Sequence, residues 1–360
     1  MTLRKVTISE LTTFVESGEY LKYGILPITP LRAISQANNP KAKPDDVVLT
    51  LSLGDDGQLQ GFIGALPDNI KNEHCAWNSC WWVKPGCSAE TSLKLFLSFL
   101  TDWNKKVLFS ELTPHTNSLI EKLKFCNHQT IRGLRGYTRF CLADILPRKK
   151  SWTKKIRWLL RITDTIANIF MPLIFASNPL PKAIHIEAID FPKEDDNAFI
   201  EKHNTLQPAK RYSEDYKWIK KFNWIETFQK GAGNSPVNYP FSYRTKRFEM
   251  QWLRFSYEDR TVALAAYTLR DKELKLPCIY AEKEFIPQIG DYFYNMLLKD
   301  KCLCSATTFD PDLANYLLTK KKFIFKTRLP KYTAISKALS ESETIERFIM
   351  QMGDGDAIFT

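Results

Sequence analysis

The sequence lacks the short motifs that mark several large enzyme classes. HExxH, the phosphate-binding GxxxxGK[ST] loop and GxSxG are all absent, which removes several hydrolase and nucleotide-binding classes. The eight cysteines form no CxxC pair, and Cys302 and Cys304 stand two apart. We therefore expect free thiols in a reducing cytosol, with neither a disulfide framework nor a metal site.

Signals for export or for crossing a bilayer are missing as well. The first residues, MTLRKVTISEL, are charged and contain no signal-peptide core. The longest apolar segment, 156–176, is interrupted by two arginines, an aspartate and an asparagine, which makes it too polar to span a membrane. These absences favour a cytoplasmic protein.

The positive charge of the chain is concentrated in one place. The formal net charge is +11, and the stretch 147–161 contains a cluster of basic residues, namely Arg148, Lys149, Lys150, Lys154, Lys155, Arg157 and Arg161. A nucleic-acid-binding domain more often spreads its basic residues over one face. The local clustering favours an anionic membrane surface, and nucleic acid is an unexpected partner.

The segment that follows has the periodicity of an amphipathic helix, broken near Pro172. At 100° per residue, its apolar side chains, Trp158 among them, fall on one broad arc, and its polar side chains share the opposite arc. Such a helix fits the headgroup plane of a membrane, on which Lys149, Lys150, Lys154, Lys155 and Trp158 would lie. A helix buried between two domains has the same pattern, and the sequence leaves both interpretations open.

This basic segment divides the chain into halves with the same expected order of elements. We expect a first domain at 1–146, a linker at 147–181, a second domain at 182–340 and a polar tail at 341–360. In the first half, strands are expected at 47–52, 59–66, 74–83, 107–112 and 137–142, and helices at 9–20, 31–37, 88–103 and 117–124. In the second half, strands are expected at 249–257, 262–269, 276–281, 303–308 and 331–335, and helices at 199–204, 214–228, 289–298 and 311–320.

One local match supports a true internal repeat. The run NSLIEKLKF at 117–125 and the run NYLLTKKKF at 315–323 share Asn, Leu, Lys, Lys and Phe at a constant offset. The agreement of the surrounding element order makes chance a weaker explanation.

These features resemble the GNAT superfamily of N-acyltransferases. Val83-Lys84-Pro85, at the end of a strand and before a helix, is similar to that family's pantetheine strand and pyrophosphate loop, and NSLIEKLKF resembles its N…LYEKLGF helix. The resemblance implies an α/β (mixed α+β) fold of two tandem GNAT-like domains, each a twisted mixed sheet flanked by helices. It also implies an acyl-CoA or acyl-carrier-protein co-substrate and no tightly bound cofactor. The donor would contact Trp82, Val83, Ser88, Ala89, Thr91 and Asn117, although strand packing explains Trp82 as well.

The chain departs from this family where the donor phosphates bind. The glycine-containing loop is replaced by Ser88-Ala89-Glu90-Thr91-Ser92-Leu93, so the backbone approaches phosphates less closely. The family's tyrosine acid corresponds to Ile120 and Leu318. These departures favour donors carried by a protein over free acetyl-CoA.

The candidate catalytic residues are Glu111, His115 and Tyr137. Each lies on, or just after, the strand expected to face the acceptor, and a carboxylate or imidazole there would keep an amine neutral as general base. The leading hypothesis is a transferase that moves an acyl group to a lipid or long-chain amine, such as a sphingoid base, at the inner face of the membrane. The alternatives are a Fem-type transferase that uses aminoacyl-tRNA on a cell-envelope precursor and a non-catalytic binding protein of the same fold.

Overall fold

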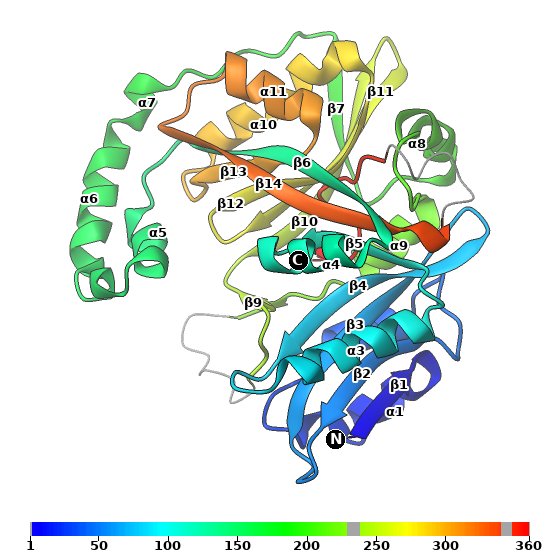
Figure 1. The fold of residues 1–360 in the computed structure, drawn as a ribbon. Helices are drawn as coiled ribbons and strands as arrows, with labels where there is room; N and C mark the ends of the chain where they lie inside the picture. The colour runs from blue at the N-terminus through cyan, green and yellow to red at the C-terminus, as the bar shows by residue number, and fades with distance from the viewer. Residues whose placement is uncertain (1, 229–237, 340–347, 360) are drawn as a thin grey trace. The chain divides into compact units, whose positions relative to one another are not determined.

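The protein is described from a computed structural model, which covers residues 2–228, 238–339 and 348–359. Two compact units are present. Unit 1 comprises Met1–Ile131, Asp190–Lys246 and Lys331–Thr360, and unit 2 comprises Arg132–Ile189 and Arg247–Pro330. Each unit contains a mixed sheet flanked by helices, which confirms the predicted fold class (Figure 1).

The units do not follow the division expected at 146 and 182. The segment 190–246 belongs to unit 1, although it lies beyond the linker in the sequence. For example, the indole nitrogen of Trp218 donates to the Ser35 carbonyl oxygen at 2.8 Å. The described part of the expected polar tail, 348–359, is largely buried, with Met350, Ile358 and Phe359 at most 1% exposed. The remainder of that tail lies outside the described residues.

Unit 1 combines an N-terminal αβ region with two later segments. Its main strands are β1 Thr2–Thr7, β2 Val47–Leu53, β3 Leu59–Ile70, β4 Glu73–Val83 and β5 Val107–Leu112, and the sheet order is β1-β2-β3-β4-β5-β14. Its helices are α1 Ile8–Glu16, α2 Pro30–Ala37, α3 Ala89–Asp102, α4 Pro114–Leu123, α8 Asn197–His203 and α9 Ser213–Lys221. A small separate sheet is formed by β8 Glu226–Thr227 and β9 Arg244–Thr245.

Both faces of the unit 1 sheet are covered because its central strands are apolar on both sides. Side chains alternate across a strand, so Phe62 and Ile63 of β3 join different clusters. Phe62 packs with Leu11 and Phe14 of α1, and Ile63 belongs to the cluster that contains Phe96 of α3. The next strand, β4, lies between β3 and β5 in this sheet, so it too is a central strand.

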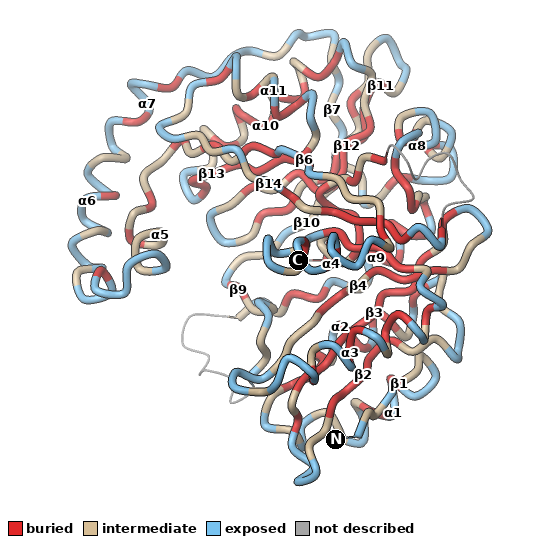
Figure 2. Tube along the Cα trace, in the orientation of Figure 1, coloured by how far each residue is buried: buried red, intermediate tan, exposed pale blue. Residues whose placement is uncertain are grey.

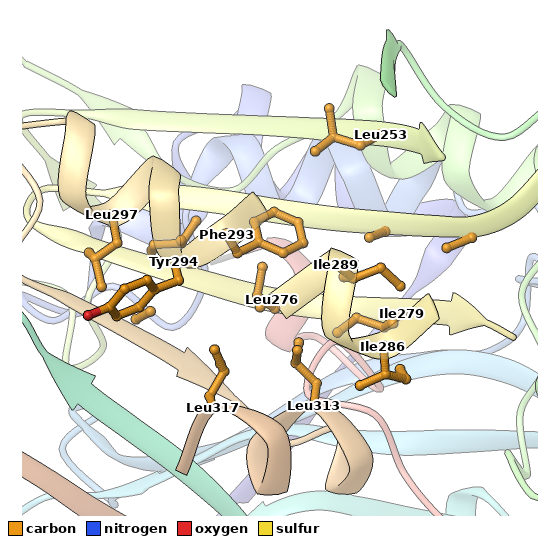
Figure 3. Close-up of a cluster of buried hydrophobic side chains, with 14 of the residues drawn as sticks. Leu253, Leu276, Ile279, Ile286, Ile289, Phe293, Tyr294, Leu297, Leu313 and Leu317 are labelled. Carbon is orange, nitrogen blue, oxygen red and sulfur yellow. The ribbon is translucent and has the colours of Figure 1, made fainter. Parts of the chain in front are cut away.

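Unit 2 contains the linker helices and the second sheet. Its strands are β7 Ile184–Ile189, β10 Phe248–Tyr257, β11 Arg260–Arg270, β12 Glu273–Ala281 and β13 Ser305–Thr308, in the sheet order β6-β13-β12-β11-β10-β7. Its helices are α5 Leu142–Lys149, α6 Arg157–Ile169, α7 Met171–Ile174, α10 Ile286–Lys299 and α11 Pro311–Lys320. Figure 3 shows the core of this unit, in which α10 directs Ile289 and Phe293 toward the strand residues Leu253 and Leu276.

The internal repeat is confirmed by the element order. The series β2, β3, β4, α3, β5, α4, β6 recurs as β10, β11, β12, α10, β13, α11, β14. The last strand of each series pairs with the other series: β6 (Cys126–Tyr137) pairs with β13 in unit 2, and β14 (Phe325–Ser336) pairs with β5 in unit 1. The repeats therefore exchange their closing strands.

Two expected elements were wrong. The closing strand predicted at 137–142 lies earlier, as β6, and the chain after it begins α5. In β6, Gly133 and Gly136 lie against the rings of Phe309 and Phe323 at distances that leave no room for a Cβ atom, which explains why this strand has little apolar signal. The helix predicted at 214–228 ends at Lys221, and Glu226–Thr227 forms β8.

Candidate active site

The parallel strands β4 and β5 of unit 1 separate after a short paired stretch. They pair only at Ala76↔Val107 and Trp77↔Leu108. Beyond that point β4 pairs with β3 alone, whereas β5 pairs with β14. Within the described residues, β4 from 78 to 83 therefore has a strand partner on one edge only.

The C-terminal segment enters unit 1 where these two strands diverge. A Cβ atom on Gly355 would lie 2.7 Å from the Ser110 hydroxyl oxygen and 3.3 Å from the Trp77 ring. Gly355 also has a φ of +70°, a conformation that glycine adopts without strain. Only glycine fits at this position, where the backbone lies so close to Ser110 and Trp77. The close contact places the next residue, Asp356, beside β4.

Asp356 is the centre of a polar cluster with Ser79 and Arg32. The Ser79 hydroxyl donates to the Asp356 carboxylate at 2.7 Å, and the Arg32 guanidinium lies 3.6 Å from the same carboxylate and donates to Ser79. Arg32 donates to the Tyr239 hydroxyl at 3.1 Å and stacks on the Trp224 ring with its guanidinium carbon 4.4 Å from the ring centroid. These contacts hold Arg32 rigidly, with its charge directed at Asp356.

Burial sets the protonation behaviour of this cluster. Burial raises the pKa of the Asp356 carboxyl, Arg32 and Ser79 oppose that change, and Glu111 raises it further. Burial alone would lower the pKa of Arg32, but Tyr239, Cys80 and Asp356 raise it above its ordinary value, so the guanidinium remains charged. Burial also raises the pKa of Tyr239 to about 12. Asp356 is therefore a partly buried carboxylate, with 23% of its side chain exposed, whose raised pKa makes it a stronger base.

A second buried network anchors the segment that carries Asp356. Arg211 donates to the carbonyl oxygens of Gly353 and Gly355 at 2.7 and 2.6 Å. The Lys331 ammonium donates to the carbonyl oxygens of Gln351 and Met352 at 2.7 and 3.1 Å. These bonds from buried cations fix the backbone of the segment on both sides of Asp354.

Two of the predicted catalytic residues lie in unit 1. Glu111 is exposed near the end of β5 and acts electrostatically on Asp356. His115 is exposed in the first turn of α4. Glu111 is therefore close enough to influence the cluster, whereas no recorded side-chain contact connects His115 to it.

Tyr137 and Asn117 take other positions than expected. Tyr137 belongs to unit 2, pairs with Ser305 and contacts the Phe325 ring, so it is not part of the unit 1 cluster. Asn117 does not begin its helix, because Thr113 is the N-cap and Pro114 the first residue. The Asn117 amide donates to Glu121 at 2.9 Å, and its oxygen faces His128 at 3.2 Å, which gives this buried side chain a structural role.

The predicted donor-binding residues surround the start of α3. Trp82 and Val83 are half-buried at the end of β4, and Trp82 packs against Phe62. Ser88 is the N-cap of α3, Ala89 is exposed and Thr91 is buried. The N-terminus of a fourteen-residue helix thus stands at the unpaired end of β4, where an anionic group would meet the positive end of the helix dipole.

The linker helix α6 presents its apolar arc to solvent. Its polar arc faces the protein instead: Asp164 accepts hydrogen bonds from the backbone of Leu142 and Ala143 at 2.8 and 2.9 Å, and Asn168 exchanges two bonds with Phe140. Figure 2 shows most of α6 and α7 as exposed. The exposed large apolar side chains of this region are Trp152, Trp158, Leu159, Ile162, Ile166, Ile169, Phe170, Leu173 and Ile174.

Among the described helices, none has both the length and the apolar character needed to cross a membrane. In the same residues, no cluster of three or more His, Cys, Asp or Glu side chains could hold a metal ion. All eight cysteines carry free thiols.

Comparisons with known proteins show the fold. The N-myristoyltransferase of Saccharomyces cerevisiae with bound myristoyl-CoA is similar, with a TM-score of 0.51 and 10% identity, and the match covers 93% of this chain and 79% of that chain. A probable N-acyltransferase from Enterococcus faecalis has a TM-score of 0.50 at 11% identity, and the match covers 93% of this chain and 72% of that chain. The chain has the fold of these N-acyltransferases. No family model matches the sequence, and a search of the curated proteins returns no match.

A third solved structure is similar at a lower TM-score over part of its own length. It is the GCN5-related glucosamine N-acetyltransferase region of a fungal multi-domain β-N-acetylglucosaminidase, with a TM-score of 0.48 and 9% identity. The match covers 92% of this chain and 38% of that chain. This chain therefore corresponds to a minor part of that larger protein.

The most deeply placed part of the site has no recognisable motif in the sequence. Asp356 was assigned to a polar tail, and Arg32 and Tyr239 drew no attention because they lie far apart in the sequence. The only local signal was the GDGD run at 353–356, in which glycines alternate with aspartates and permit a close backbone approach.

Proposed function

We propose that this chain is an N-acyltransferase that moves an acyl group from acyl-CoA or an acyl-carrier protein to a lipid or long-chain amine at the inner face of a membrane. The observation that carries the proposal is the carboxylate of Asp356, placed beside the unpaired edge of β4 at the point where β4 and β5 separate. The fold supports acyl transfer, and the exposed apolar arc of α6 supports a membrane-borne acceptor.

In this proposal the acyl donor lies along the free edge of β4. Backbone groups of 78–83 pair with the pantetheine arm, and the N-terminus of α3 faces the phosphate of the donor. Because this loop contains no glycine-rich run, its backbone cannot approach the donor phosphate as closely. We therefore expect the donor to be held by its carrier protein as well as by β4.

Asp356 serves as the general base. It accepts a proton from the acceptor ammonium, and the neutral amine nitrogen then attacks the thioester carbonyl carbon. A tetrahedral intermediate forms and collapses, the carbon–sulfur bond breaks, and the departing thiolate takes up a proton from the amide-forming nitrogen. Arg32 and Ser79 position Asp356, and burial raises its pKa so that it accepts a proton more readily at neutral pH.

The acyl-transfer test compares two carboxylate variants. Purified protein is incubated with long-chain acyl-CoA or acyl-carrier protein and with sphingosine, and the N-acyl product is measured by mass spectrometry. Removal of a general base lowers the rate about 100- to 10,000-fold, so we expect that loss in Asp356→Asn. Asp45→Asn, an exposed carboxylate of the same unit, is the matched control and should remain active.

Other results of this assay would replace the proposal. Product formed only with aminoacyl-tRNA would identify a Fem-type transferase. No product with any donor, combined with tight binding of the amine, would identify a non-catalytic binding protein of this fold. Full activity of Asp356→Asn would show that Asp356 is not the base, and Glu111→Gln and His115→Ala would then be the next variants to measure.

Membrane docking is tested separately with vesicles. The apolar arc of α6 and the preceding lysines would bind anionic vesicles, with binding that weakens as salt increases, because each lysine near the surface contributes on the order of 1 kcal/mol. The combined replacement of Lys149, Lys150, Lys154 and Lys155 by Gln should release the protein. Trp158→Ser should weaken binding at all salt concentrations because its 64% exposed ring supplies apolar contact. Salt-independent binding, or none, would contradict this part of the proposal.

A further inference from the structure

Unit 2 contains a cavity that the acyl-transfer proposal does not use. It has a volume of about 650 Å³, within the range of roughly 300–1,000 Å³ that is usual for small-molecule sites. Its lining residues come mainly from the α7 region, from the end of α11 and from the chain that leads into β14. The lining residues are Phe140, Met171, Ile174, Phe175, Thr319, Lys320, Lys321, Lys322, Phe323, Ile324 and Lys326.

Several of the side chains that line the cavity are apolar and buried. Met171 and Phe175 of the α7 region are 6% and 8% exposed. Phe323 packs edge-on against Tyr294 with ring centroids 5.5 Å apart, and its ring lies against Gly136. These rigid aromatic and aliphatic walls fit a hydrocarbon chain better than a polar metabolite.

Four lysines and no acidic residue line the cavity. One of these lysines, Lys321, forms an ion pair, because its ammonium lies 2.5 Å from the Asp291 carboxylate. Lys326 donates to the Leu318 carbonyl oxygen at 2.6 Å, an acceptor that carries no formal charge. Lys320 and Lys322 are exposed, and the described residues include no carboxylate paired with them. Three lysine charges thus remain available to an anion.

The cavity opens beside the apolar surface of the linker. Ile174 lines the cavity and is also 54% exposed, and its neighbour Leu173 is 83% exposed. A molecule held in the cavity would therefore emerge at the surface that α6 and α7 present. An occupant must combine a hydrocarbon chain with a negatively charged head.

We infer that this cavity binds a single anionic phospholipid taken from the membrane surface. The acyl chain lies among Met171, Phe175 and Phe323, and the phosphate lies on Lys320, Lys322 and Lys326. This inference rests on the proposed membrane docking, and it adds recognition of the headgroup charge to the non-specific attraction of the linker lysines. The bound lipid would fix α7 against α11.

The experiment separates the cavity from general membrane attraction. Binding is measured to vesicles of phosphatidylcholine alone, to the same vesicles with added phosphatidylglycerol, and to soluble dioctanoyl-phosphatidylglycerol. The cavity variant is Lys320→Gln/Lys322→Gln/Lys326→Gln. The control variant is Lys283→Gln/Lys299→Gln/Lys301→Gln, which removes the same charge from exposed lysines of unit 2 that do not line the cavity.

We expect the soluble lipid to bind the wild type and the control variant, and to bind the cavity variant more than about tenfold more weakly. Glycerol phosphate, which lacks the acyl chains, should not compete; competition by it would show an anion site without a chain site and would overturn the inference. Equal weakening in both triple variants, or no binding of the soluble lipid, would also overturn it. Vesicle binding that depends only on Lys149, Lys150, Lys154 and Lys155 would then leave the proposed docking intact.

Photo-crosslinking tests whether the acyl chain of the lipid lies inside the cavity. A phosphatidylglycerol with a diazirine in its acyl chain should label peptides that contain Met171, Phe175 or Phe323. Labelling confined to Trp158 and the rest of α6 would overturn the cavity site while supporting docking. Absence of vesicle binding by the wild type, with soluble lipid still bound, would refute the docking proposal and retain the cavity site.

Discussion

Removal of Arg211 should release the segment that carries Asp356. The Arg211 side chain is 3% exposed and donates to two carbonyl oxygens, those of Gly353 and Gly355. Arg211→Met keeps most of the apolar stem of the side chain and deletes both bonds. The change also removes a positive charge that lowers the pKa of Asp354, a buried carboxyl of the same segment.

The size of this effect follows from the two bonds. A hydrogen bond from a charged group contributes about 1.5–3 kcal/mol, so two contribute about 3–6 kcal/mol. Breaking a buried charged contact by removing one partner typically costs about 3–5 kcal/mol. We therefore expect local opening of 348–359 to become easier by about 3 kcal/mol or more, which is at least a hundredfold in the opening equilibrium.

Hydrogen–deuterium exchange measures this opening directly. Amides of 350–359 should exchange at least about a hundredfold faster in Arg211→Met, and acyl transfer should fall with the loss of a fixed Asp356. Lys217→Met, an exposed lysine on α9 in a 3.5 Å surface pair with Glu214, should change stability by less than about 0.5 kcal/mol. Lys331→Met, which deletes the other anchor, should repeat the effect. Unchanged exchange in both anchor variants would refute the account of how this segment is held.

Further predictions concern a helix cap, a close approach, the second repeat and the donor. Burial raises the pKa of Asp310 to about 6, above its value of about 3.9 in an unfolded chain. The folded state therefore binds the proton more tightly than the unfolded state. As a result, the contribution of Asp310 to stability falls as pH rises from about 4 to about 6. Asp310→Asn, which retains an N-cap for Leu313, should raise the melting temperature at pH 7 and remove that dependence; an unchanged pH profile would contradict the assignment. Gly355→Ala should destabilise the protein, because the new Cβ atom would meet Ser110 at 2.7 Å, and thermal melting checks this. Glu282→Gln should leave acyl transfer intact, since this carboxylate is held by Arg260 in unit 2 at 2.6 and 2.7 Å; loss of product would place the chemistry in the second repeat. Acyl-carrier protein should be a better donor than acetyl-CoA in the same assay, and equal turnover would show that the missing glycines have no effect.

Local pattern was sufficient for most secondary structure. The strand predicted at 107–112 is β5, and the helix predicted at 311–320 is α11, with its Asp310 N-cap and Pro311 as first residue. Both are specified by nearby residues: an apolar run in one case, and a capping residue followed by proline in the other. The repeat was visible for the same reason, because the runs at 117–125 and 315–323, at α4 and α11, share residues at matching positions.

The amphipathic linker was also visible in the sequence, but its orientation was not. Periodicity shows that α6 has two faces and says nothing about which face meets the protein. The structure turns the polar face inward because the carboxylate of Asp164 and the amide of Asn168 satisfy backbone groups at the start of α5. The apolar face is left exposed as a result.

The sequence by itself determined the mixed α/β class, the duplicated element order, the position of the linker and its two-faced character. Tertiary structure alone decided the exchange of β6 and β14 and the return of 190–246 to unit 1. It also decided the insertion of Gly355 and Asp356 between β4 and β5. The physical reason is distance along the chain: Asp356, Ser79 and Arg32 share no local pattern, and their contacts form only after strand pairing and burial have brought three separate segments together.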